Sequence, residues 1–138
     1  KRQLFDRLGA SVLSVIDLDN NMVGHWAWDF GDLFRSVAFS RGGFDEHDYQ
    51  ACLDGFLQGR GEKFSEDNSL VENLVEAPGF LAFMLGLRFL TDHLSGDRYF
   101  KVSNHGTNLQ RAIEQFGLFA QFQSNQEIMR AGAEKLLG

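Results

Sequence analysis

The stretch VLSVIDLDNNMVGHWAWDFGDLFRS (residues 12–36) decides how the chain is organised. Its first five residues are mostly apolar and β-branched, which predicts a strand that is at least half-buried. The strand ends in two carboxylates, Asp17 and Asp19, which lie one pleat apart on the same face of an extended chain. Magnesium is usually held by one or two carboxylates together with substrate phosphates. The stretch therefore predicts a magnesium site led by Asp17, and phosphoryl transfer; the alternative is a strand end whose carboxylates simply face water.

Length and composition predict one domain over residues 1–138. Hydrophobic residues make up 43% of the chain, including 14 phenylalanines, which is enough for a core. The net charge of −6 argues against a nucleic-acid or anionic-membrane partner. No uninterrupted apolar run reaches the roughly 18 residues of a membrane span, no signal peptide is evident, and the single Cys52 suits a reducing cytoplasm. We interpret the chain, which begins at Lys1 in a strand-like segment, as a cytoplasmic fragment.

The predicted architecture is mainly α with an N-terminal β-hairpin. Three consecutive segments divide the domain: the hairpin over residues 2–17, a metal loop over 17–29, and a helical part over 29–137. In the hairpin, a turn-like segment at residues 7–11 separates two strand-like runs. Because two strands alone are only marginally stable, the hairpin must pack on the helices or extend a larger sheet.

Helical periodicity begins at Asp29. Apolar residues then recur at i, i+3, i+4 and i+7, and the pattern breaks at Arg41-Gly42-Gly43. Asp45 is a suitable N-cap for a second helix that continues through Gln58, and Ser65 is a suitable N-cap for a third.

Pro78 marks the point at which the third helix kinks or a new helix begins. From Gly79 to Leu94 the sequence is nearly continuously apolar, which predicts a central helix that is buried on most sides. Gly96 ends this helix, and residues 105–137 form one long C-terminal helix or two.

Two further pairs are candidates for a functional site. Arg88 and Asp92 share one face of the apolar helix at i, i+4 spacing, where they form an intrahelical ion pair or contact a substrate. Tyr99 and Phe100 lie on a polar loop, where they stack on a ring or seal a core edge. The spacing of the four histidines, with each other or with Cys52, predicts no zinc site.

The tripeptide Asp29-Phe30-Gly31 is similar to the one that carries a metal-binding Asp in protein kinases. That motif should follow a strand, whereas here it opens a helix. We therefore assign Asp29 a structural role, bracing the loop below the metal site, and we expect Gly24 to order the same loop.

Taken together, these residues resemble a known family. The combination of Ile16-Asp17, Gly24 and Asp29 is similar to a pattern in the C-terminal lobe of the aminoglycoside/choline-kinase-like phosphotransferases (the phosphotransferase enzyme family). Four phrases between residues 12 and 116 resemble the N-acetylhexosamine 1-kinases of that family. They are VIDLDNNMVG, DFGDLFRS, LGLRFLTDHLSGDRYFK and HGTNLQRAIEQF, in this order.

The resemblance implies the C-terminal lobe of a protein-kinase-like fold. It implies an ATP- and Mg²⁺-dependent kinase that phosphorylates the anomeric hydroxyl of an amino sugar, an N-acetylhexosamine. In this family Asp17 would bind Mg²⁺. Arg88 and Tyr99 would help to bind the sugar, with Asp92 as a supporting acceptor, and Trp26 would line the same pocket.

The chain departs from the family pattern at the catalytic loop. It contains no His-x-Asp, the signature that supplies the base, and Arg2 stands where a second metal-binding residue, Asn, is expected. The glycine loop and Lys of an ATP-binding lobe are also absent from the sequence, and Asn20 stands where close relatives often have Thr. We therefore expect the isolated chain to be inactive as a kinase.

Two other interpretations stay open. One is a catalytically incomplete pseudokinase or sugar-binding module that keeps the acceptor pocket. The other is a purely structural helical domain with an acidic surface. A lobe separated from its partner would expose apolar surface, so we also expect self-association, for example through the open edge of the hairpin.

Overall fold

Helices make up most of the structure, a computed structural model that describes residues 2–5, 12–16, 23–60, 69–102, 104 and 106–138. The helices are α1 (Trp26–Arg41), α2 (Glu46–Arg60), α3 (Leu70–Leu94), α4 (Thr107–Ser124) and α5 (Gln126–Leu137). The predicted mainly α class is confirmed. Two antiparallel strands, β1 (Arg2–Phe5) and β2 (Val12–Ile16), precede the helices. The residues between the strands lie outside the described part of the chain, so the hairpin as a unit stays a prediction.

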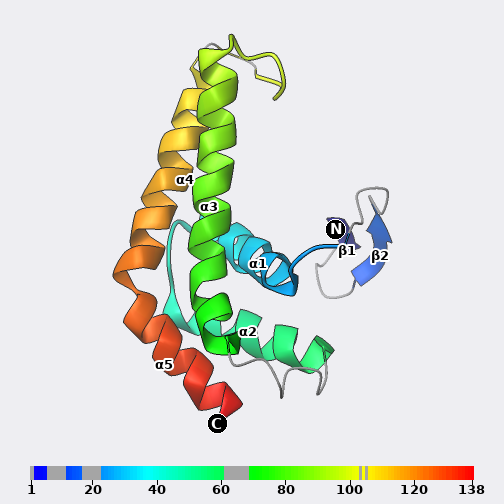
Figure 1. The fold of residues 1–138 in the computed structure, drawn as a ribbon. Coiled ribbons are helices and arrows are strands. Elements are labelled where there is room, and N and C mark those ends of the chain that lie inside the picture. The colour runs from blue at the N-terminus through cyan, green and yellow to red at the C-terminus, as the bar shows by residue number, and fades with distance from the viewer. Residues whose placement is uncertain (1, 6–11, 17–22, 61–68, 103, 105) are drawn as a thin grey trace.

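α3 is the axis of the fold (Figure 1). α4 runs alongside it, α1 crosses its first half, and α5 packs on its first turns and on α2. The crossing of α1 over α3 is close because of Gly31. A Cβ atom at that position would lie 2.7 Å from the carbonyl oxygen of Ala77, so only glycine allows the two backbones to approach in this way.

The ends of α1 show how far local signals decide a helix boundary. The helix begins three residues before Asp29, because the His25 side chain caps it: Nδ1 accepts the backbone N–H of Ala27 at 3.3 Å. The predicted break is confirmed. Gly42 has the left-handed φ of 91° that ends a helix, and its N–H and that of Gly43 turn back to the last carbonyls.

The other boundaries are partly as predicted. Asp45 caps α2, because its Oδ1 accepts the N–H of Asp48 at 2.9 Å, and the helix runs two residues past Gln58. Ser65 lies outside the described residues. The C-terminal segment is two helices, since α4 ends and α5 begins at Asn125, whose side-chain amide donates to the Gln121 carbonyl at 2.8 Å.

Pro78 neither ends α3 nor begins a new helix, which excludes one of the two predicted alternatives; a kink at this position stays a prediction. Proline lacks an N–H, so the carbonyl of Leu74, four residues earlier, loses its helical partner. The hydroxyl of Tyr49, a buried side chain of α2, donates to this carbonyl at 3.4 Å. The core therefore supplies the hydrogen bond that the proline removes, and α3 continues.

The core lies where α1, α2, α4 and α5 meet the first half of α3. Aromatic rings dominate it: Phe34 lies 5.0 Å from Tyr49 and 5.4 Å from Phe122 between ring centroids, and Phe30 lies 5.9 Å from Tyr49. Met129 brings α5 into the same cluster. Each of these side chains is almost completely buried.

The second half of α3 is exposed along one face, so the prediction that residues 79–94 are buried on most sides is wrong. The buried face carries Ala82 and Gly86, whereas Phe80 is 46% and Leu94 is 78% exposed. Among the described helices, the main neighbour of this half is α4 (Figure 1). Within the described residues, α3 alone has the length and mean hydropathy (1.4) of a membrane-crossing helix, a test that core helices also pass.

Candidate functional site

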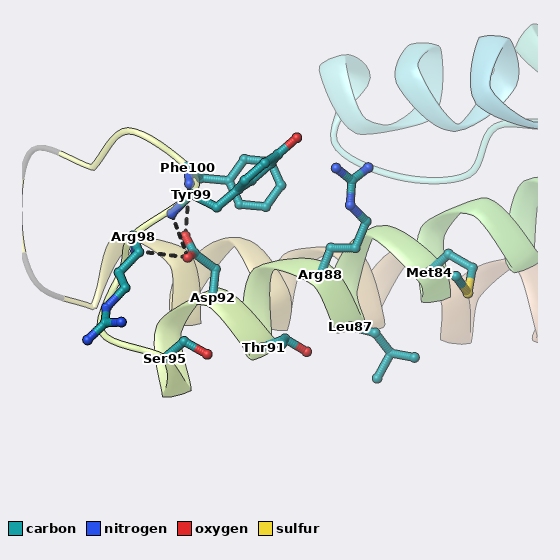
Figure 2. Close-up of a pocket in the computed structure, with 9 residues that line it drawn as sticks. All are labelled: Met84, Leu87, Arg88, Thr91, Asp92, Ser95, Arg98, Tyr99 and Phe100. Atoms are coloured by element: carbon teal, nitrogen blue, oxygen red, sulfur yellow. Dashed lines mark hydrogen bonds between the residues drawn. The ribbon is translucent and has the colours of Figure 1, made fainter.

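A groove of about 600 Å³ lies at the end of α3, between this helix and the loop that follows it (Figure 2). Its apolar walls are Met84, Leu87 and Phe100. Two hydroxyls, from Thr91 and Ser95, line it as well. Its ionisable or phenolic side chains are Arg88, Asp92, Arg98 and Tyr99. Binding pockets for small molecules are typically of this size and combine apolar walls with a few polar groups.

Asp92 builds the loop wall of the groove. Its Oδ1 accepts the backbone N–H groups of Arg98 and Tyr99 at 2.9 and 2.8 Å, and its Oδ2 accepts that of Phe100 at 2.9 Å. A fourth bond comes from the side-chain amide of Asn108 in α4, also at 2.9 Å. A carboxylate has about four lone-pair sites, so the protein itself uses the whole acceptor capacity of Asp92.

The loop can fold back onto Asp92 because of two left-handed residues after the helix. Gly96 has φ 88° and Asp97 has φ 56°. The N–H of Asp97 donates to the Asp92 carbonyl at 2.8 Å, which closes the turn. The Asp97 carboxylate accepts the second N–H of the Asn108 amide at 2.9 Å, so one buried amide joins the helix, the turn and α4.

The environment of Asp92 stabilises its charged form. Burial on its own raises the pKa of the carboxyl, but the N–H groups of Phe100, Tyr99 and Arg98 together lower it by more. The net result is a pKa below the ordinary value of an aspartate. The residue is 6% exposed, so a buried anion with a full set of donors anchors the loop.

Arg88 does not pair with Asp92, in contrast to the intrahelical ion pair that their spacing allows. Its guanidinium lies 5.8 Å from the ring centroid of Tyr99 and 5.5 Å from that of Phe100, within cation–π range. Figure 2 shows Arg88 and the two rings on the same side of α3. Tyr99 is 73% exposed, so it forms the rim of the groove.

Three of the predicted site residues thus meet in one place, but Trp26 does not join them. Trp26 starts α1, where its ring lies 6.3 Å from that of Phe56 and 5.3 Å from the guanidinium of Arg60. α1 crosses α3 near Ala77, whereas the groove begins at Met84, two turns further along. Trp26 is therefore not among the residues that line this groove, and its contact with a sugar stays a prediction.

The other predicted residues lie near the start of α1 or outside the described part of the chain. Asp29 is an exposed residue in the first turn of α1, where a carboxylate favours the positive end of the helix dipole. Gly24 lies against the Trp28 ring. Asp17 and Asp19 belong to residues that the structure does not describe. Elsewhere, the described residues contain no group of three or more His, Cys, Asp or Glu side chains that could hold a metal ion.

Sequence reasoning missed two residues of this site, Asn108 and Arg111. Asn108 is completely buried, and its amide oxygen accepts from Arg111 Nη1 at 3.0 Å. The guanidinium of Arg111 also lies 5.6 Å from the Phe89 ring centroid. A usable signal was present, since the polar Asn108 shares helical spacing with the apolar Ala112, Leu118 and Phe122, which lie on the buried side of the same amphipathic helix.

No family model matches the chain, and no solved structure matches it significantly.

Proposed function

We propose that the chain is the acceptor-binding part of an ATP- and Mg²⁺-dependent small-molecule kinase. In this proposal the chain forms the C-terminal lobe of a protein-kinase-like fold. The acceptor is an amino sugar of the N-acetylhexosamine class. One observation carries the proposal. Arg88, Asp92 and Tyr99, which the family resemblance associates with sugar binding, all line one groove of about 600 Å³.

The groove has the chemistry of a sugar site. The guanidinium of Arg88 and the hydroxyls of Thr91 and Ser95 offer hydrogen bonds to ring hydroxyls or to an acetamido oxygen. The Tyr99 ring is amphipathic and offers an apolar face with a polar tip. Asp92 acts as a positioning residue, because the loop N–H groups and Asn108 already occupy its oxygens.

In this proposal Asp17 and Asp19 would hold Mg²⁺, and the ion would neutralise charge on the phosphates of ATP. The base that accepts the proton of the sugar hydroxyl comes from outside these 138 residues, since the sequence contains no His-x-Asp. Kinase activity is therefore proposed for a polypeptide that includes this chain together with a nucleotide-binding part.

A sugar-binding module without catalysis is the second candidate. The observation that favours it is that every described residue lining the groove belongs to α3 or to residues 95–100. Binding would then need neither ATP nor a second lobe. The two candidates differ in one measurement: the kinase transfers phosphate from ATP to the sugar, and the module binds the sugar without turnover.

Calorimetric titration of this chain with N-acetylglucosamine and N-acetylgalactosamine tests the groove. We expect binding that Arg88→Ala and Tyr99→Ala each weaken at least tenfold. Arg130→Ala is the matched control, because Arg130 pairs with Glu72 on the surface, away from the groove. Absence of binding to these sugars, or an equal loss in Arg130→Ala, would refute the assignment of the groove.

The kinase itself is tested in the longest natural polypeptide that contains the chain. With ATP and Mg²⁺, we expect phosphate transfer to the same sugars, and a loss of at least a hundredfold in kcat on Asp17→Asn. Asp54→Asn is the control, since Asp54 is an exposed α2 residue that bonds only to Gln58 of its own helix among the described partners. Sugar binding without turnover would instead favour the module.

A further inference from the structure

The exposed face of α3 carries a mainly apolar stripe of four large apolar side chains and one threonine, which we define as Phe80, Met84, Leu87, Thr91 and Leu94. All five side chains are exposed, and Phe83 and Trp28 extend the stripe at its edges. Trp28 stacks on Phe80 with 6.2 Å between ring centroids. Exposed apolar surface that is continuous along a helix indicates a contact with another molecule, whereas single exposed apolar residues are ordinary.

The spacing of the stripe indicates what kind of surface it fits. Its positions, 80, 84, 87, 91 and 94, alternate between steps of four and three residues. This is the spacing of the a and d positions of a heptad repeat, in which side chains of one helix insert between those of a second helix. The opposite face of α3 is the one that packs inside the protein, through Ala82 and Gly86. The stripe therefore fits another helix with the same spacing.

The charge distribution favours a protein partner over a lipid surface. Between Phe80 and Leu94, Arg88 is the one exposed charged side chain, because Asp92 is buried. The centres of protein interfaces are depleted of charge in this way. A helix that lies on an anionic membrane instead has a polar face rich in Lys and Arg, and this chain carries a net charge of −6.

The size of the stripe reaches the lower limit for a specific interface. A fully exposed aromatic or large apolar residue offers about 150–250 Å², so the exposed fractions of the stripe and its edges amount to about 500 Å² per copy. Two copies would bury about 1,000 Å², which is the size at which a specific interface becomes plausible.

We propose that the α3 stripe is the interface of a homodimer, in which α3 of one copy packs against α3 of a second. This interface differs from the hairpin edge suggested by the sequence, and it does not rest on the sugar-binding role. Met84, Leu87 and Thr91 belong both to the stripe and to the lining of the groove. Dimer formation therefore covers part of the groove, and a ligand that fills the groove shifts the equilibrium towards the monomer.

Sedimentation equilibrium of this chain over a wide concentration range tests the proposal. We expect a monomer–dimer equilibrium whose Kd rises at least a hundredfold in Phe80→Glu/Leu94→Glu, because this pair puts charge at both ends of the stripe without changing a residue that lines the groove. Ile128→Glu is the matched control, an equally apolar α5 residue that is 41% exposed. It should leave the Kd unchanged. Circular dichroism checks that all variants stay folded. If the double variant does not fold, the Kd of Leu94→Glu is measured in its place.

Two further experiments vary the salt concentration and test binding to lipid vesicles. Each copy carries a charge of −6, so salt screens their repulsion and should tighten an apolar dimer, whereas a dimer held by ion pairs would weaken. Vesicles of phosphatidylcholine and phosphatidylserine should not bind the chain. The proposal is overturned by a monomer at every concentration, by an association that Ile128→Glu weakens as much as the stripe variant, or by vesicle binding that requires Phe80 and Leu94.

Discussion

At the scale of single residues, Asp92 decides the shape of the groove. The sequence places it on an apolar helix four residues after Arg88, which suggests an ion pair, but its four bonds come from the loop and from α4. Backbone N–H groups that lie six to eight residues away cannot be recognised as partners from side-chain types. What the sequence does indicate is that a carboxylate on so apolar a helix needs donors, and the loop provides them.

Asp92→Asn should therefore open the loop and, if the groove binds a sugar as proposed, weaken that binding. Asparagine keeps one acceptor oxygen and turns its amide N–H₂ towards N–H groups that are themselves donors. Because the pKa of Asp92 is lower in the folded than in the unfolded chain, its stabilisation is complete above the unfolded value of about 3.9 and is lost as the pH falls through the folded value.

The measurement is thermal unfolding from pH 7 to pH 2.5. We expect Asp92→Asn to lower Tm at pH 7 and to remove part of the acid-induced loss of stability that the wild type shows below about pH 4. Asp54→Asn is the control, an exposed carboxylate whose described hydrogen bond stays within α2. If Asp92→Asn and wild type lose Tm in parallel down to pH 2.5, the carboxylate does not anchor the loop through its charge.

Gly31 is needed for the close approach of α1 to α3. In Gly31→Ala the new Cβ would lie 2.7 Å from the Ala77 carbonyl oxygen, which is backbone and cannot turn away. α1 and α3 must separate, and we expect a loss of about 1–3 kcal/mol in the free energy of unfolding, as for overpacked cores.

Gly55→Ala is the matched control for this variant. Gly55 lies within α2, and nothing lies within 4 Å of a Cβ added there. This substitution should stabilise the chain by about 0.5–1 kcal/mol, because alanine is the better helix former. Urea unfolding measures both changes, and equal effects of the two variants would mean that the helix crossing has room for a side chain.

At the scale of the elements, local signals and long-range contacts had different predictive value. The cap at Asp45 and the break at Gly42 involve atoms within a few residues, so the sequence predicts them correctly. The exposure of the second half of α3 depends on how many neighbours the helix has, which composition does not state. The prediction of a helix buried on most sides therefore failed there.

α3 continues through Pro78 instead of giving way to a new helix, for a reason that can be tested. The hydroxyl of Tyr49 donates to the Leu74 carbonyl that the proline leaves without a helical partner, and burial raises the pKa of that hydroxyl. Tyr49→Phe should lower the free energy of unfolding by about 1 kcal/mol, since it leaves a buried carbonyl unsatisfied.

A double-mutant cycle isolates this bond. In Pro78→Ala the N–H of residue 78 can bond to the Leu74 carbonyl, so the cost of Tyr49→Phe should fall to less than half in that background. Chemical denaturation of the four proteins gives the coupling energy. An equal cost of Tyr49→Phe in both backgrounds would mean that the hydroxyl does not serve this carbonyl.

At the scale of the whole molecule, α3 joins two regions of different character. Its first half lies in the aromatic core, with helices on several sides, and its second half carries the groove on the loop side and the apolar stripe on its exposed face. Arg88, Asp92 and Tyr99 line one groove because they lie close together in the sequence, on one helix and the loop after it; that they bind a sugar stays a prediction. Trp26 lies away from this groove, because the position of α1 along α3 depends on the contact between Gly31 and Ala77, which no sequence pattern predicts.

The last helix tests whether the helical part folds as one unit. Met129 of α5 is completely buried in the same cluster as Tyr49 and Phe34, whereas its neighbour Ile128 is 41% exposed. Met129→Ala should lower the free energy of unfolding by about 2–5 kcal/mol, the usual cost of truncating a buried side chain of this size. Ile128→Ala should cost less than about 1 kcal/mol.

Urea unfolding followed in parallel by far-ultraviolet circular dichroism and tryptophan fluorescence provides the check, because both tryptophans lie at the start of α1, far from α5 in the sequence. If the core is cooperative, the two signals move together to a lower midpoint in Met129→Ala. A circular dichroism transition that moves while the fluorescence transition stays in place would mean that α5 unfolds separately from the rest of the helical part.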